Sequence, residues 1–270
     1  MTTAKNKITA ASFGPMKKKG EKIVWITSYD YYTARALDAA GVDGLLVGDT
    51  LNMVVYGHKD TLSATMETML RHTEAVSRAA QTAMVVGDMP FGSYQTSDTD
   101  AVRNAMRFLA EGGAAGIKLE GGIEMAPRIR RITEAGIPVF GHIGLTPQSI
   151  NKFGGYRVQG KTDVGKNYLL ESAQALEEAG CFSVVLEAMK NDIARKITES
   201  LTIPTIGIGA GKDTDGQIIV INDIMGVGED FMPKFVRQYF NYQAKLREVG
   251  AKFAADVRSG SYPNDAESYG

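Results

Sequence analysis

One short pattern recurs along the chain and limits the folds that it can adopt. A helix-like segment ends in a small residue and a glycine, and a short apolar run follows at once. Examples are Ala39-Ala40-Gly41 before Leu45-Leu46-Val47, and Glu178-Ala179-Gly180 before Val184-Val185-Leu186. Glycine after a helix adopts the left-handed C-cap at no steric cost. The runs do not alternate, which is typical of strands buried on both faces, so the pattern predicts a parallel sheet.

Eight such runs can be counted, and amphipathic helices fit between them, for example Met69–Ala80 and Leu169–Ala179. Eight parallel strands with intervening helices favour a closed α/β structure, the (β/α)₈ TIM barrel, over an open doubly wound sheet, which stays the alternative. We expect one domain over residues 1–270, with an N-terminal cap in the first 20 residues and C-terminal helices within Met232–Val257. The expected strands are Ile23–Tyr29, Gly44–Gly48, Met84–Asp88, Gly116–Glu120, Pro138–His142, Ser183–Glu187, Pro204–Ile208 and Gln217–Ile221.

Charge and composition exclude several classes of partner. The formal net charge is −1, so no electrostatic attraction to nucleic acid or to an anionic membrane is expected. No apolar run approaches the roughly 18 residues that span a bilayer. We expect the Lys17-Lys18-Lys19 run to be a solvated turn and Cys181, the only cysteine, to be a buried apolar residue. A cytoplasmic protein is the expectation.

Ionisable residues stand where the predicted strands end. Five of the apolar runs are followed by one, and Lys118 lies within the fourth. In a barrel, the carboxyl ends of the strands build the active site. Surface ion pairs at the rim could explain any single one of these residues, but their recurrence favours one shared site. The residues at the run ends are Asp49, Asp88, Glu120, His142 and Glu187.

Three of these residues offer hard oxygen ligands. Buried carboxylates are costly unless they are paired or bind a cation. The chain has no paired cysteines and no zinc-type histidine spacing, whereas Asp49, Asp88 and Glu120 suit octahedral Mg²⁺. Manganese or cobalt could occupy the same kind of site.

Several long segments, in order along the chain, resemble one enzyme family. They include Val47-Gly48-Asp49-Thr50-Leu51, Gly87-Asp88-Met89-Pro90-Phe91-Gly92-Ser93-Tyr94 and Ile117-Lys118-Leu119-Glu120-Gly121-Gly122. Others are Gly141-His142-Ile143-Gly144-Leu145-Thr146-Pro147-Gln148-Ser149 and Pro204-Thr205-Ile206-Gly207-Ile208-Gly209-Ala210-Gly211. The family is that of ketopantoate hydroxymethyltransferase, within the phosphoenolpyruvate mutase-like superfamily.

The resemblance implies an activity and a role for each site residue. The family transfers a hydroxymethyl group from 5,10-methylenetetrahydrofolate to 3-methyl-2-oxobutanoate, giving 2-dehydropantoate for pantothenate synthesis. Its members are homo-oligomers, often decamers. By resemblance Glu187 is the proton acceptor, and the metal ligands are Asp49, Asp88 and Glu120. The substrate-binding residues implied are Asp49, Thr50, Asp88, Lys118 and His142.

The chain departs from the family pattern at a few positions. Thr50 stands where serine is usual, Asn52 where glycine is usual, and Ala188-Met189-Lys190 where Cys-Val-Pro is common. Two other functions stay open: a folate-independent carbon–carbon lyase or ligase of the same superfamily, and a non-catalytic binding protein on a retained barrel.

Overall fold

A computed structural model describes residues 6–228 and 232–270. These fall into two compact units, divided between residues 219 and 220, and each is described by itself. The prediction of a single domain over 1–270 stays a prediction.

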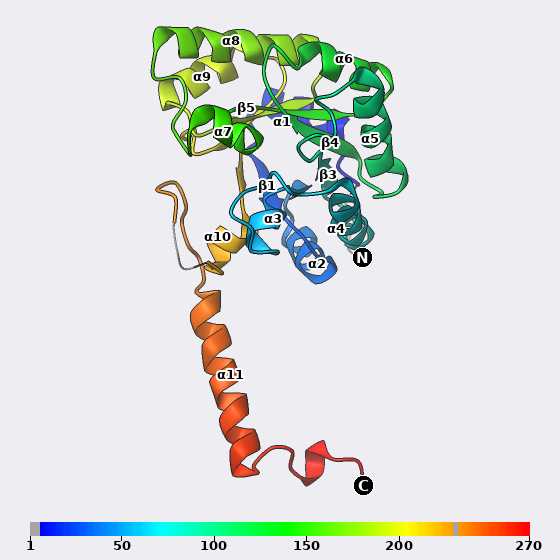
Figure 1. The fold of residues 1–270 in the computed structure, drawn as a ribbon, viewed down its shortest axis with the longest axis vertical. Coiled ribbons are helices and arrows are strands. Elements are labelled where there is room, and N and C mark those ends of the chain that lie inside the picture. Colours follow the sequence, from blue (N-terminus) through cyan, green and yellow to red (C-terminus); the bar gives the residue numbers. More distant parts are fainter. Residues whose placement is uncertain (1–5, 229–231) are drawn as a thin grey trace. The chain divides into compact units, whose positions relative to one another are not determined.

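The first unit is a closed barrel of eight parallel strands in the order of the sequence, so the predicted TIM barrel is confirmed (Figure 1). All eight expected strands are present, with ends that differ from the predicted ones by two residues or fewer. The strands are β1 Ile23–Thr27, β2 Gly44–Val47, β3 Met84–Asp88, β4 Gly116–Glu120, β5 Val139–Gly144, β6 Ser183–Glu187, β7 Thr205–Ile208 and β8 Gly216–Ile219.

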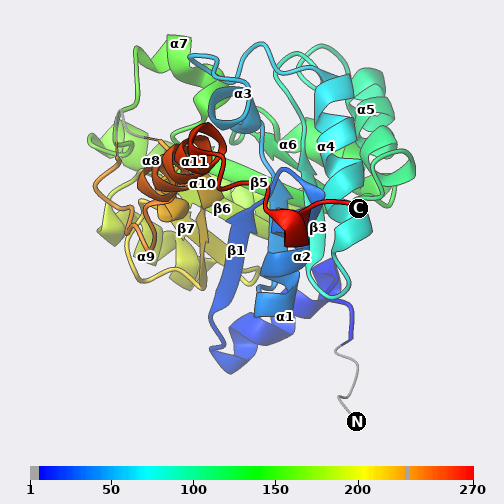
Figure 2. The ribbon, with the colours of Figure 1, turned by 90° about the horizontal axis from the view of Figure 1, so that it is seen from below.

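Helices surround the strands (Figure 2). Side-chain caps start several of them: Asp30 accepts from the Thr33 amide and Ser97 from the Asp100 amide. The helices of this unit are α1 Ala10–Lys19, α2 Tyr31–Ala40, α3 Leu51–Val54, α4 Met66–Ala79, α5 Asp98–Ala110, α6 Ala126–Glu134, α7 Ile150–Phe153, α8 Asp163–Glu178 and α9 Asn191–Ser200, with a 3₁₀ turn at Pro147–Ser149.

The connection between β7 and β8 lacks the helix that an ideal (β/α)₈ barrel has there. Residues 209–215 join β7 to the neighbouring parallel strand β8 without a helix. Gly209 and Gly211 both have positive φ, 62° and 90°, which non-glycine residues rarely adopt. This glycine-rich segment therefore forms a tight turn between the two strands.

The N-terminal segment packs against the interior of the barrel, as the predicted cap requires. Phe13 of α1 is buried in the same apolar cluster as Trp25 and Phe140. The ring centroids of Phe13 and Trp25 are 5.4 Å apart, and those of Trp25 and Phe140 are 4.9 Å apart. Gly44 has no side chain, and a Cβ there would overlap the Trp25 ring, so glycine makes room for the indole.

The prediction of a solvated turn at Lys17–Lys19 was wrong. These residues form the last turn of α1. The Lys17 ammonium donates to the carbonyls of Thr198, at 2.8 Å, and Ile203, at 3.1 Å, and pairs with Asp215 at 2.9 Å. Lys17 is therefore partly buried and connects α1 to the segments on either side of β7.

In the described residues of the second unit, the helices are α10 Ile221–Met225 and α11 Tyr242–Ser259, with a 3₁₀ turn at Asp265–Glu267. C-terminal helices are thus confirmed, but the described residues from Met232 to Asn241 are not helical, contrary to the prediction. Within the described chain, no helix is long and apolar enough to cross a membrane.

Candidate active site at the carboxyl ends of the strands

The six ionisable residues predicted to share one mouth are brought together by neighbouring strands. In the strand register, Asp88 lies opposite Lys118, Glu120 opposite His142, and Glu187 opposite Gly144. Asp49 is the second residue after β2, and its amide donates to Asp88 Oδ2 at 3.1 Å. All but Glu187 are at most 5% exposed. Thr50 lies at the same end of β2, just before α3.

Lys118 is the central cation of this cluster. Its ammonium lies 2.9 Å from Asp88 Oδ1 and 3.6 Å from Glu120 Oε1. Burial opposes the charged form, but Asp88, Glu120 and Asp49 outweigh that cost and raise the pKa of Lys118. Lys118 is therefore charged at neutral pH.

His142 links this cluster to Glu187. Its Nδ1 is 3.3 Å from Lys118 Nζ and 3.5 Å from Glu120 Oε1, and its Nε2 is 3.2 Å from Glu187 Oε2. Burial and Lys118 lower the pKa of His142, but Glu120 and Glu187 outweigh them and raise it to about 9. The immediate sequence neighbours of Glu187 are not cationic, and the fold supplies a partner from β5 instead.

The carboxylates outnumber the nearby cations, and their pKa values respond to that excess. Burial, followed by repulsion from Asp88 and Glu120, raises the pKa of Asp49 well above its usual range. Burial likewise raises that of Asp88 despite the attraction of Lys118. Burial also acts on Glu120, but Lys118 and His142 outweigh it and lower the pKa. Additional positive charge would stabilise the ionised forms of Asp49 and Asp88.

The donor chemistry of this set fits magnesium, because carboxylate oxygens are the ligands that it prefers. As the side chains stand, no group of three or more His, Cys, Asp or Glu residues in the described part of the chain is arranged to hold a metal ion. The Lys118 ammonium lies beside both Asp88 and Glu120.

Two uncharged residues, Gln148 and Tyr94, belong to the site but were not predicted from the sequence. The Gln148 amide contacts Asp49, and its backbone N–H donates to Glu120 Oε2 at 2.9 Å. Tyr94 donates to Gln148 Oε1 at 2.7 Å. Both residues lie within the segments that carry the family resemblance, which was the available signal. Neither ends an apolar run, so a search for charges at strand ends passes over them.

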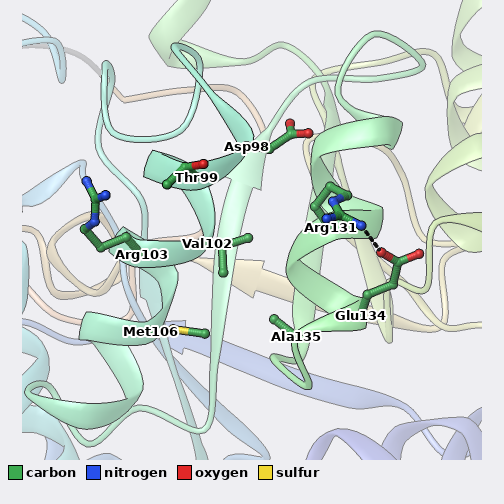
Figure 3. A pocket seen from close by; sticks show the side chains of 8 residues that line it. All are labelled: Asp98, Thr99, Val102, Arg103, Met106, Arg131, Glu134 and Ala135. Atoms are coloured by element: carbon green, nitrogen blue, oxygen red, sulfur yellow. Dashed lines mark hydrogen bonds and ion pairs between the residues drawn. The ribbon is translucent and has the colours of Figure 1, made fainter.

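A groove elsewhere on the barrel lacks this convergence. It lies between α5 and α6, where Arg131 pairs with Glu134 at 2.8 Å (Figure 3). Arg103, also in the groove, pairs with Asp100 at 3.1 Å. Asp98 of α5, which also lines the groove, pairs with Arg128 of α6 at 3.0 Å. Because the charged side chains that line the groove are already paired, it is a weaker candidate than the strand ends.

Comparison with known proteins identifies the family. The family model described as ketopantoate hydroxymethyltransferase matches residues 7–265. The chain belongs to this family. A protein of Syntrophus aciditrophicus named 3-methyl-2-oxobutanoate hydroxymethyltransferase is 53% identical, covering 97% of each chain. A Clostridium botulinum protein of the same name is 50% identical, covering 97% of this chain and 95% of its own.

Solved structures with little sequence similarity share the fold. A phosphonopyruvate hydrolase aligns with a TM-score of 0.63 at 15% identity, covering 97% of this chain and 92% of its own. A 2,3-dimethylmalate lyase of the PEP mutase/isocitrate lyase superfamily aligns with a TM-score of 0.57 at 17% identity, covering 98% and 89%. At this identity the likeness concerns the barrel alone.

Two departures from the ketopantoate hydroxymethyltransferase pattern have structural roles. The buried Asn52 amide donates to the Asp60 carbonyl at 2.7 Å and to Ser63 Oγ at 2.9 Å, so it ties α3 to the loop before α4. Ala188, directly after Glu187, has φ of 45°, a left-handed conformation uncommon for residues other than glycine. Its carbonyl accepts from the Gln159 amide at 2.8 Å.

Proposed function

We propose that this chain transfers a hydroxymethyl group from 5,10-methylenetetrahydrofolate to 3-methyl-2-oxobutanoate, giving 2-dehydropantoate for pantothenate synthesis. The observation that carries the proposal is the family match over residues 7–265, in a chain that retains the charged set at the strand ends. Both relatives reported above are named for this substrate and this transferred group.

In this proposal the buried charged residues and Thr50 bind the metal ion and the oxo acid. Asp49, Asp88 and Glu120 are the magnesium ligands, and Asp49 and Asp88 also line the substrate position. Thr50, Lys118 and His142 contact the oxo acid. Magnesium, when bound, supplies Lewis-acid polarisation of the 2-oxo group. The charge set supports this division, because the buried carboxylates outnumber the cations beside them.

Glu187 has the role of proton acceptor. Its side chain is 18% exposed, more open than the other carboxylates, and it lies 3.2 Å from His142 Nε2. The carboxylate takes the proton from C3 of the oxo acid, and the electron pair moves onto the 2-oxo oxygen. Lys118 places positive charge where that oxygen becomes negative. C3 then forms the new carbon–carbon bond to the methylene carbon of the folate, and both C–N bonds of that carbon break. Water supplies the hydroxyl oxygen of the product, and its second proton and the proton taken from C3 end on the two folate nitrogens.

The direct test is an assay for 2-dehydropantoate with purified protein, 3-methyl-2-oxobutanoate and Mg²⁺, run with and without methylenetetrahydrofolate. We expect product only when the folate is present. Cleavage or ligation of an oxo acid without folate would favour the lyase or ligase alternative. Absence of turnover together with retained oxo-acid binding would favour the non-catalytic one.

We further propose a homo-oligomer, a decamer by analogy with the family, located in the cytoplasm. The only cysteine supports a reducing compartment: Cys181 is a free, buried thiol whose pKa burial raises to about 12. Sedimentation equilibrium tests the assembly, and a monomer at micromolar concentration would contradict it.

A further inference from the structure

Gln148 lies between two of the proposed metal ligands and touches both. It follows β5 in the 3₁₀ turn Pro147–Ser149 and is buried. Its side-chain Nε2 donates to Asp49 Oδ2 at 3.0 Å and to the Met89 carbonyl at 2.9 Å. Its backbone N–H donates to Glu120 Oε2 at 2.9 Å. One residue therefore bonds to carboxylates that extend from two different strands.

The surroundings of this side chain require an amide. The two neighbours of Nε2 are a carboxylate and a carbonyl, which only accept hydrogen bonds, so this end of the side chain must donate. The other end, Oε1, accepts from Tyr94 OH at 2.7 Å and from Gln95 Nε2 at 3.3 Å. The Met89 carbonyl, which can only accept, therefore fixes which way the amide points. Tyr94 and Gln95 hold its other end, and the amide orients Asp49.

The contacts leave the second oxygen of each carboxylate for other partners. Gln148 engages Asp49 Oδ2 and Glu120 Oε2, whereas Glu120 Oε1 is the oxygen 3.6 Å from Lys118. Hydrogen bonds of this kind hold metal-binding carboxylates in their orientation before the ion arrives, and their loss typically lowers metal affinity about 10- to 100-fold.

We propose that Gln148 is a positioning residue that orients Asp49 for a divalent cation, with Tyr94 holding the other end of its amide. This rests on the proposed role of Asp49 and Glu120 as metal ligands. The competing explanation is that Gln148 only fastens the segment after β5 to the Met89 carbonyl. The two explanations differ in metal affinity, because loss of a fastening alone would lower stability without changing how tightly the folded protein binds the ion.

The test measures binding of Mn²⁺ alone to the full-length protein by electron paramagnetic resonance, together with the thermal unfolding midpoint. Gln148→Met keeps the length of the side chain and removes its hydrogen bonds. Ser183→Ala is the matched control, because it removes another buried hydrogen bond, from Oγ to the Pro204 carbonyl at 2.8 Å. Ser183 begins β6, whereas the proposed site lies where the strands end. Tyr94→Phe keeps the glutamine and removes the donor to its Oε1, together with the 3.2 Å contacts between the Tyr94 hydroxyl and the Glu120 backbone.

We expect Gln148→Met to raise the Kd for Mn²⁺ about 10- to 100-fold, and Tyr94→Phe to raise it by a smaller factor in the same direction. Ser183→Ala should lower the unfolding midpoint and leave that Kd unchanged. If Gln148→Met does not fold, Tyr94→Phe decides, and an unchanged Kd in that variant would overturn the proposal. If the wild-type protein does not bind Mn²⁺, the assignment of the metal ligands is wrong, and the positioning role of Gln148 is wrong with it.

Discussion

Replacing Glu187 by glutamine isolates the proton-transfer step of the proposed reaction. The substitution keeps the shape of a side chain that is 18% exposed at the end of β6. It also keeps an oxygen that can accept from His142 Nε2, which lies 3.2 Å from the carboxylate. What disappears is the negative charge and the ability to take a proton from carbon.

The size of the effect follows from what is lost. Removing a general base typically slows a reaction about 10²- to 10⁴-fold, or about 3–5 kcal/mol of barrier at 1.36 kcal/mol per tenfold. The cost in folding free energy should be near 1 kcal/mol, because the exchanged contact is one hydrogen bond at a partly open position. Catalysis should therefore fall far more than stability.

The assay uses the first half of the reaction alone. In D₂O with Mg²⁺ and 3-methyl-2-oxobutanoate, and without folate, the wild type should exchange the C3 proton for deuterium. Glu187→Gln should bind the oxo acid and lose most of this exchange. The exposed Glu171→Gln on α8 is the control and should exchange at the wild-type rate. Exchange by Glu187→Gln at that same rate would refute the reasoning and leave His142 as the next candidate.

Three other substitutions test separate parts of the structure. Asp88→Ala should weaken Mg²⁺ binding and activity together, and full activity in the presence of a chelator would contradict the metal assignment. Thr50→Ser keeps the hydroxyl and should change turnover by less than about tenfold, roughly 1.4 kcal/mol; a collapse in rate would indicate a changed substrate. Asp38 is partly desolvated, but amide donors from residues 81–83 outweigh this and lower its pKa. Its stabilising contribution is therefore present at neutral pH and lost as pH falls below about 4. Asp38→Asn should cost about 1–3 kcal/mol of unfolding free energy at pH 7, with the difference from wild type shrinking in acid; a pH-independent difference would contradict this.

The barrel was predictable because its signals are local. The Gly41 and Gly180 C-caps have φ of 85° and 95°, so each marks a helix end in the sequence itself. The strands that follow are buried on both faces, which removes the alternation of a half-exposed sheet and leaves short apolar runs. The position of the ionisable residues after those runs then follows from the direction of parallel strands.

What could not be predicted depends on contacts between distant parts of the chain. Lys17 resembles its lysine neighbours in sequence, and only the packing of α1 brings its ammonium to Asp215. Gln148 has no charge or periodicity to mark it, and its role emerges when Asp49 lies 3.0 Å from its amide.

The position of Lys118 connects the fold of this site to its chemistry. A lysine two residues before Glu120 on the same strand points to the same side of the sheet, because side chains alternate along a strand. The register then places it opposite Asp88, so the barrel fixes a cation between two carboxylates without any loop. Lys118, with His142 beside Glu120, does not offset three buried carboxylates, and burial, followed by repulsion from Asp88 and Glu120, raises the pKa of Asp49. The same rigid elements that bury the carboxylates thus leave them short of positive charge, which is the condition under which binding of a further cation is most favourable.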